Sequence, residues 1–221
     1  MAMNMAIEFI NVSKKFGKKT VLKELNFVIP TGNVIGLQGI NGSGKTMIMR
    51  LIAGLIYPTT GDVLIDKKRL GKDISFPESL GLMLENPAFL DSYSGFENLK
   101  LLASLNKKIT DKEIFEVLTL VGLSDNADKK YKKYSLGMKQ RLGIAAAIME
   151  KPDIILLDEP TNSLDEDGIR MVREIVFKEK ERGATVVLSC HDATILKQLS
   201  DSVLCIENGE IVDNYICKKE V

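Results

Sequence analysis

The sequence has no tryptophan, one histidine and three cysteines, and its 30 basic and 30 acidic residues leave no net charge. Cys190, Cys205 and Cys217 are odd in number and lack C-x-x-C spacing, which favours a reducing compartment and free thiols in the core. Because the charges balance, no global field attracts nucleic acid or an anionic membrane surface. We therefore expect no nucleic-acid partner, and any such contact has to be local.

Long hydrophobic runs are missing as well. No apolar stretch approaches the ~20 residues that a membrane-spanning helix needs. Residues 1–5 lack the basic-then-apolar design of a secretory signal, so we expect a cytoplasmic location. With 45% hydrophobic residues, the 221-residue chain can bury a real core, as one large domain or a domain with an inserted subdomain.

What the sequence does contain is a phosphate-binding pattern at residues 39–46. The sequence GINGSGKT fits G-x-x-x-x-G-K-[ST] and directly follows the apolar segment 34–37, which predicts a buried strand. An ordinary glycine-rich turn is the alternative, but the strand-loop-helix context favours a nucleotide site. Lys45 is expected to reach the β- and γ-phosphates, and the Thr46 hydroxyl to ligate Mg²⁺. The predicted nucleotide-binding residues here are Asn41, Gly42, Ser43, Gly44, Lys45 and Thr46.

Two adjacent carboxylates, Asp158 and Glu159, end the apolar segment 154–157. At the carboxyl edge of a parallel sheet, an Asp can hold Mg²⁺ and the next Glu can face an attacking water. A carboxylate there costs free energy unless a metal or hydrogen-bond donors compensate it, which argues against a purely structural pair. We predict that Asp158 is a metal ligand and that Glu159 is the general base.

Hydrophobic patterns around these motifs predict an α/β fold. Its core is a P-loop NTPase core with a mainly parallel sheet flanked by helices, and it carries an N-terminal antiparallel β-layer and an inserted helical subdomain. We expect one domain over residues 1–221, with the core and β-layer at about 1–86 and 150–221 and the helical subdomain at about 87–149. The expected strands are 7–10, 21–29, 34–37, 63–65, 154–157, 184–188 and 203–206, with a turn at 14–19. The expected helices include 47–53, 110–121, 142–149 and 165–180, and a capping box at Thr110 and Glu113 opens the second of them.

The segment 134–141, with the sequence YSLGMKQR, resembles the signature motif of the nucleotide-binding subunits of ABC transporters. That motif is usually Leu-Ser-Gly-Gly-Gln followed closely by Gln-Arg. A serine hydroxyl, a glycine N–H and a helix N-terminus can together stabilise a γ-phosphate, as the family's signature does across a dimer interface. The alternative is that the serine is an ordinary helix cap, which is what a serine at a helix start usually indicates. Ser135, Gly137, Gln140 and Arg141 match the motif, while Leu136 and Met138 depart from its commonest form.

The resemblance covers nearly the whole chain, with the motifs in the expected order. Segment 162–165 stands where the family has its D-loop, so Asp165 looks like the residue that couples two active sites; it also suits a helix cap. His191 matches the switch histidine, which contacts the γ-phosphate, although a lone histidine is more often structural. Phe16 stands where the family stacks an aromatic ring on adenine, or it simply packs.

Glu85 departs from the family, which has a glutamine at this position of its Q-loop. A carboxylate can still ligate Mg²⁺ or hold a water, but it adds negative charge beside a triphosphate, which a proton or a metal contact has to compensate. We therefore place Glu85 among the candidate catalytic and metal residues. Segments 85–87 and 134–141 look most like the ATPase subunits of bacterial exporters of antibiotics and antimicrobial peptides, of the bacitracin and lantibiotic types.

The resemblance implies an ATPase that uses ATP and Mg²⁺ in a head-to-tail dimer, each nucleotide lying between Lys45 of one subunit and Ser135 of the other. A second nucleotide-binding subunit and a polytopic membrane permease are the implied partners, with the permease at the lobe 87–149 beside Glu85. The chain would then be peripheral on the inner face of the membrane. The lysine-rich run 129–133 is either a solvated face or a contact. A soluble ABC-type ATPase or an ATP-sensing module is the alternative function.

Overall fold

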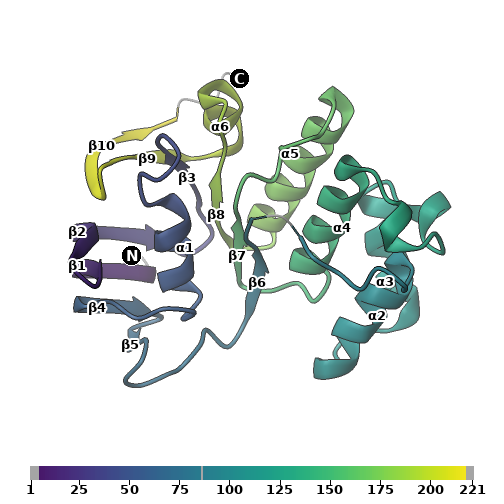
Figure 1. Ribbon diagram of the computed structural model, residues 1–221, viewed down its shortest axis with the longest axis horizontal. Coiled ribbons are helices and arrows are strands. Elements are labelled where there is room, and N and C mark those ends of the chain that lie inside the picture. The colour runs from purple at the N-terminus through teal and green to yellow at the C-terminus, as the bar shows by residue number, and fades with distance from the viewer. Residues whose placement is uncertain (1–4, 86, 218–221) are drawn as a thin grey trace.

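The computed structural model describes residues 5–85 and 87–217. An antiparallel β-layer lies on one side of helix α1 and a mainly parallel sheet on the other, followed by α4 and α5 and, farthest from the β-layer, by α2 and α3 (Figure 1). The strands are β1 (Met5–Phe16), β2 (Lys19–Pro30), β3 (Val34–Gln38), β4 (Thr60–Ile65), β5 (Lys68–Arg69), β6 (Leu80–Met83), β7 (Ile154–Leu157), β8 (Thr185–Ser189), β9 (Ser202–Glu207) and β10 (Glu210–Ile216). The helices are α1 (Lys45–Ile52), α2 (Gly95–Asn106), α3 (Asp111–Leu120), α4 (Leu136–Ile148), α5 (Glu166–Glu181) and α6 (Ala193–Leu199), with 3₁₀ turns η1 (Ser124–Asn126) and η2 (Tyr131–Lys133).

The β-layer has the strand order β2-β1-β4-β5, and each neighbouring pair is antiparallel. Phe9 and Phe27 stack with their ring centroids 4.3 Å apart. The predicted turn at 14–19 is wrong in extent, because Phe16 pairs with Lys19 and leaves only the two residues between them in the turn. Lys15 and Lys19 on these strand ends are exposed, so their charge does not oppose pairing.

The second sheet has the order β10-β9-β3-β8-β7-β6. Strands β9, β3, β8, β7 and β6 run parallel to one another, and β10 at the edge runs antiparallel to β9. On β7, Ile154 and Leu156 pack toward α1 and the β-layer, while Ile155 and Leu157 pack toward the helices on the other face. Burial on both faces is why this strand is continuously apolar.

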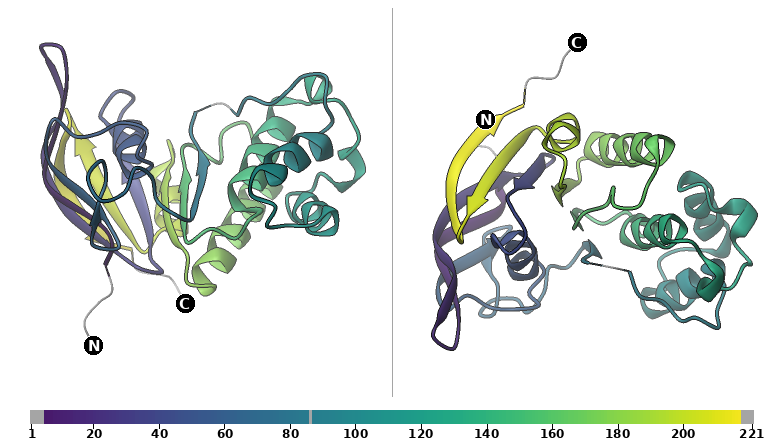
Figure 2. Two further views of the ribbon diagram at one scale, coloured as in Figure 1. Left: turned by 90° about the horizontal axis from the view of Figure 1, so that it is seen from below. Right: turned by 45° about the horizontal axis from the view of Figure 1, so that its top comes forward.

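Strands β6 and β10 were not predicted. β6 is short and contains Gly81, and β10 is largely exposed, so neither carries a strong apolar pattern. Figure 2 shows β10 (yellow) beside the N-terminal strands (purple), where the Lys23 N–H donates to the Gly209 carbonyl at 2.8 Å. The central sheet and the β-layer are thereby joined at this end.

The predicted capping box at Thr110 and Glu113 is confirmed at the start of α3. Helix α4 begins at Leu136, well before the predicted start at 142, because the Ser135 hydroxyl caps it by accepting the Met138 N–H at 3.2 Å. α4 contacts β6 and β7 as well as α2 and α3. It therefore links the helical lobe to the central sheet.

Candidate active site

The candidate site lies where β3, β8, β7 and β6 end. These strands are neighbours and run parallel, so their carboxyl ends meet at one edge of the sheet. The phosphate-binding loop follows β3, Asp158 and Glu159 follow β7, and Glu85 follows β6. Residues far apart in the sequence thus converge in space, as open α/β sheets require for ligand binding.

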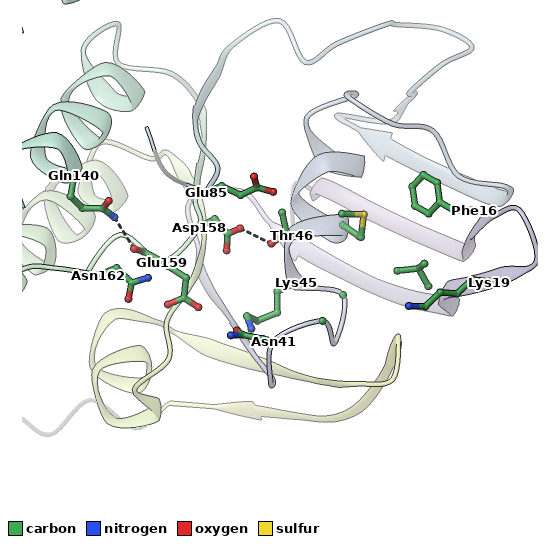
Figure 3. A pocket seen from close by; sticks show the side chains of 14 residues that line it. Phe16, Lys19, Asn41, Lys45, Thr46, Glu85, Gln140, Asp158, Glu159 and Asn162 are labelled. Atoms are coloured by element: carbon green, nitrogen blue, oxygen red, sulfur yellow. Dashed lines mark hydrogen bonds between the residues drawn. The ribbon is translucent and has the colours of Figure 1, made fainter. Parts of the chain in front are cut away.

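A cavity of about 690 Å³ opens at this edge. In Figure 3, Lys45, Thr46, Asp158 and Glu159 lie around one end of it and Phe16 around the other. Its volume falls in the range of small-molecule sites. It is lined by Phe16, Lys19, Val21, Asn41, Gly42, Gly44, Lys45, Thr46, Met47, Glu85, Gln140, Asp158, Glu159 and Asn162.

The phosphate-binding loop adopts backbone conformations that require glycine at two positions. Gly42 has φ 81° and Gly44 has φ 123°, both in the region that favours glycine. Lys45 opens α1, and its ammonium donates to the Gly39 carbonyl at 2.7 Å. Since the first N–H groups of a helix lack partners within it, this end of α1 suits an anion. Ser43 is buried and does not line the cavity.

Asp158 is held between two hydroxyl groups. Its side chain is buried, Oδ2 accepts from Thr46 Oγ1 at 2.6 Å, and Oδ1 accepts from Ser189 Oγ at 2.6 Å. The sequence predicted the proximity of Asp158 and Thr46 but assigned no role to Ser189. The available signal was a polar residue closing the otherwise apolar strand 185–189.

Glu159 differs from Asp158 because neither of its buried carboxylate oxygens has a hydrogen-bond partner in the part of the chain that the structure describes. Its backbone φ is 52°, an unusual value for a residue with a side chain. His191 Nε2 lies 3.7 Å from Glu159 Oε1, just beyond hydrogen-bond distance. The only histidine therefore stands beside the predicted base, although it does not line the cavity.

The Glu85 carboxylate is compensated by an arginine that the sequence analysis did not consider. Arg50 on α1 contacts Glu85 with its Nη2 2.5 Å from Oε1. Glu85 lines both the nucleotide-sized cavity and a neighbouring groove of about 470 Å³. An ion pair thus offsets the charge that we expected a proton or metal to offset; Asn86, which follows in the predicted exporter motif, lies outside the described residues.

Residues 22–162 match the family model described as ABC transporter. The chain belongs to this family. It is 46% identical to the ABC transporter ATP-binding protein YybJ of Bacillus subtilis over 97% of this chain and 99% of the relative. It is also 37% identical to the bacitracin transport ATP-binding protein BcrA of Enterococcus faecalis (96% and 70% covered) and 35% identical to the lantibiotic transport ATP-binding protein SrtF of Streptococcus pyogenes (91% and 87%).

Solved structures agree with this assignment. The dimeric bacterial ABC transporter cassette MJ0796 superposes with a TM-score of 0.86 at 26% identity, covering 97% of this chain and 100% of that one. CbiO1 from Clostridium perfringens, described as part of the ABC transporter complex cbiONQ, gives 0.83 at 25% identity, with 98% and 90% covered. The predicted family and fold are confirmed, and the chain is an ABC ATPase. Among residues 5–85 and 87–217, no helix has the length and apolarity to cross a membrane.

Three residues of the ABC signature and D-loop lie outside the cavity. Ser135 is exposed and caps α4, and Asp165 is exposed and caps α5 by accepting the Gly168 N–H at 2.9 Å. A Cβ on Gly137 would lie 2.9 Å from the Ser163 carbonyl oxygen, so the signature abuts the D-loop of the same chain. The structure shows both helix caps, which the sequence analysis gave as alternatives, and nucleotide contact by these residues stays a prediction.

The cavity of this ABC ATPase includes residues that the sequence analysis did not select. Lys19 and Val21 alternate on β2, and Lys19 is paired with Phe16 across the hairpin. Gln140 and Asn162 were noticed only as parts of motifs. The side chain of Phe16 is half exposed, with the Lys14 ammonium 5.0 Å from its ring centroid. The ring is therefore not buried in the hydrophobic core, and one part of it is free to contact a ligand. Lining residues without an assigned role are Lys19, Val21, Met47, Gln140 and Asn162.

Proposed function

We propose that this ABC ATPase binds Mg²⁺ and ATP in the cavity, hydrolyses ATP, and powers a separate membrane permease that exports an antibiotic or antimicrobial peptide. The observation that carries the proposal is the convergence of Lys45, Thr46, Asp158 and Glu159 on one cavity. Lys45 supplies a positive charge to the phosphates, and the start of α1 supplies N–H groups. The half-exposed ring of Phe16 at the far end suits stacking on adenine.

The side chains of Thr46 and Asp158 fit a magnesium ion. Among the described residues there is no group of three or more His, Cys, Asp or Glu side chains that would make an all-protein metal site. Mg²⁺ in nucleotide sites takes one or two protein oxygens and completes its shell with phosphates and water. Thr46 Oγ1 and Asp158 Oδ2, 2.6 Å apart, can supply those oxygens. The ion would neutralise developing charge on the phosphates.

Glu159 is placed to accept a proton from water. Within the described residues neither carboxylate oxygen has a hydrogen-bond partner, so their lone pairs are free to accept a proton from a water that enters beside them. His191 stands on the same side and can donate a hydrogen bond to the γ-phosphate when its imidazole is neutral. Glu85, held by Arg50, lies near enough to the cavity to take part in ordering water or metal.

The second half of the nucleotide site comes from another subunit. Ser135, Gly137 and Asp165 line no part of the cavity in their own chain, although they match motifs that contact nucleotide in the family. A head-to-tail pair would bring them to the Lys45 of the partner. The MJ0796 cassette, of similar fold, is described as dimeric.

The permease contact is proposed at the groove next to Glu85. This groove lies between the central sheet and the helical lobe, including Leu82, Phe89 and Leu102. Contact there would place the ATPase on the inner face of the membrane. A division of the chain into a core and a helical lobe at about 87–149 suits this contact, because the groove then lies between the two parts. The bacitracin and lantibiotic relatives support the cargo class.

The first test uses Glu159→Gln, with Glu174→Gln on the exposed face of α5 as the matched control. With Mg²⁺ and ATP, Glu159→Gln should lose more than about 100-fold in turnover and elute as an ATP-bound dimer, because the clamp forms while the base is missing. Glu174→Gln should behave like the unmodified protein. Turnover retained by Glu159→Gln, or a monomer with ATP bound, would contradict the proposed mechanism.

The second test addresses the partner. Purification from native membranes in mild detergent should recover a polytopic membrane protein with the ATPase, and loss of the permease gene should sensitise cells to a peptide antibiotic. Recovery of ribosomes, or of the ATPase alone, would favour the soluble ABC-type or ATP-sensing alternative.

A further inference from the structure

Ser189 is a buried serine that closes β8 between the candidate metal ligand and the candidate base. Its exposed fraction is 0%. Its hydroxyl donates to Asp158 Oδ1 at 2.6 Å and accepts the backbone N–H of Glu159 at 2.9 Å. A serine hydroxyl has one hydrogen and two lone pairs, so donation to Asp158 leaves a lone pair for Glu159. One side chain therefore holds both acidic residues.

The peptide backbone at Glu159 needs such support. Its φ of 52° lies in the left-handed region, which is unfavourable for a residue with a side chain and persists only where the surroundings enforce it. The N–H of Glu159 is held by Ser189, and its carbonyl accepts from Gln140 Nε2 at 2.8 Å. Gln140 belongs to α4, which Ser135 caps. The two bonds fix Glu159 from opposite sides.

We propose that Ser189 is a positioning residue for ATP hydrolysis: it fixes the Glu159 backbone in its left-handed conformation and occupies Asp158 Oδ1, which leaves Oδ2 for the metal. Gln140 is its counterpart on the carbonyl side of Glu159. The inference rests on the proposed roles of Asp158 and Glu159. In this proposal Ser189 and Gln140 act through Asp158 and Glu159 and do not touch the reacting atoms.

The two residues differ in a way that can be measured. Ser189 bonds to Asp158 and to Glu159, whereas Gln140, among the described residues, bonds to Glu159 and not to Asp158. Removing the serine hydroxyl should therefore disturb both metal affinity and the position of the base. Removing the glutamine amide should disturb the base alone.

The experiment measures kcat, the KM for ATP, the Mg²⁺ concentration for half-maximal activity and the melting temperature of the full chain. Ser189→Ala should lower kcat about 10- to 100-fold, since small misplacements of reacting groups cost up to that much, while KM changes less than about threefold. The Mg²⁺ requirement should rise. Ser189→Thr, which keeps the hydroxyl, should recover most of kcat. Gln140→Leu should lower kcat with the Mg²⁺ requirement unchanged.

Ser200 provides the matched control. It is also 0% exposed, but its Oγ has no hydrogen-bond partner within residues 5–85 and 87–217, and it lies outside the cavity. Ser200→Ala should keep the kcat and Mg²⁺ requirement of the unmodified protein. If Ser189→Ala unfolds the chain, Gln140→Leu and Ser189→Thr still decide the matter, because the first should lose kcat and the second should keep it.

Normal kcat in Ser189→Ala would overturn the proposal, as would a folded Ser189→Thr as inactive as Ser189→Ala. An unchanged kcat in folded Gln140→Leu would show that the hydrogen bond to the Glu159 carbonyl does not help to position the base. Glu159→Gln in the same assay separates these failures from a failure of the proposed function: if it hydrolyses ATP normally, the role of Glu159 itself is wrong.

Discussion

In the cavity, Lys45 and Asp158 are buried and hydrogen-bonded within the chain, whereas Ser135 and Asp165 are exposed at the starts of the helices that they cap. The phosphate-binding loop and the two carboxylates of the cavity lie at one sheet edge, and the Lys45 and Asp158 side chains are oriented by hydrogen bonds. The signature region presents a helix start to solvent. This difference suits the proposed head-to-tail pair, because it leaves the signature region of each chain exposed for a second copy.

The largest expected effect comes from removing the cation of the cavity region. Lys45 is only 6% exposed, and its ammonium lies at the start of α1. Lys45→Ala should weaken ATP binding and lower kcat/KM by more than about 100-fold, since a preorganised charge at a phosphate contributes several kcal/mol. Titration with a fluorescent ATP analogue and steady-state kinetics measure both. Lys178→Ala, on the exposed surface of α5, is the control; equal binding by both variants would be inconsistent with the site.

A substitution in the signature region should separate binding from hydrolysis. Ser135→Arg places a bulky charge on the exposed start of α4. It should lower turnover about 100-fold and abolish the ATP-dependent dimer, because a partner can no longer close there. ATP binding by the single subunit should change less than about threefold. Ser104→Arg, on an exposed position of α2, should retain turnover. Loss of ATP binding by monomeric Ser135→Arg would contradict this distinction, because it would show that the signature region is needed for ATP binding within a single chain.

The ion pair of Arg50 and Glu85 should give a smaller effect, because both side chains are partly exposed. Arg50→Ala leaves the Glu85 carboxylate unpaired beside the triphosphate, so the KM for ATP should rise about threefold to fivefold. Glu85→Gln in the same chain should reverse that rise by removing the charge. A double-mutant cycle on KM measures the coupling. Additive effects of the two changes would show that the pair does not compensate charge at the nucleotide.

The smallest effect concerns the loop after β8, where Cys190 lies beside Thr161. Burial raises the pKa of the Cys190 thiol above its ordinary value of 9.0, although the neighbouring Thr161 hydroxyl opposes the shift. The unfolded chain therefore releases this proton at lower pH than the folded one, so this contribution to stability is complete below the ordinary value and declines as pH rises above it. Iodoacetamide at pH 8 should modify Cys190 far more slowly in native than in urea-unfolded protein, as measured by mass spectrometry. Equal rates would contradict its burial.

Sequence reasoning predicted the strongest local signals well. The apolar runs at 34–37 and 154–157 are the parallel strands β3 and β7, and the capping box at 110–113 opens α3. It missed β6 and β10, because β6 is too short and β10 too polar to show the hydrophobic alternation of a strand. It placed the start of α4 too late because apolar residues begin after the cap. Boundaries depend on capping and pairing partners, which hydrophobic periodicity does not contain.

The sequence by itself determined the fold class, the phosphate-binding loop and the two carboxylates, because each is encoded in neighbouring residues with a strict chemical pattern. Only the tertiary structure decided what those residues touch. Arg50 beside Glu85, Ser189 beside Asp158 and Gln140 on the Glu159 carbonyl are contacts across long stretches of chain. They exist because the order β3-β8-β7-β6 brings separate loops to one edge, and strand order arises from packing of the whole chain, which no short motif specifies.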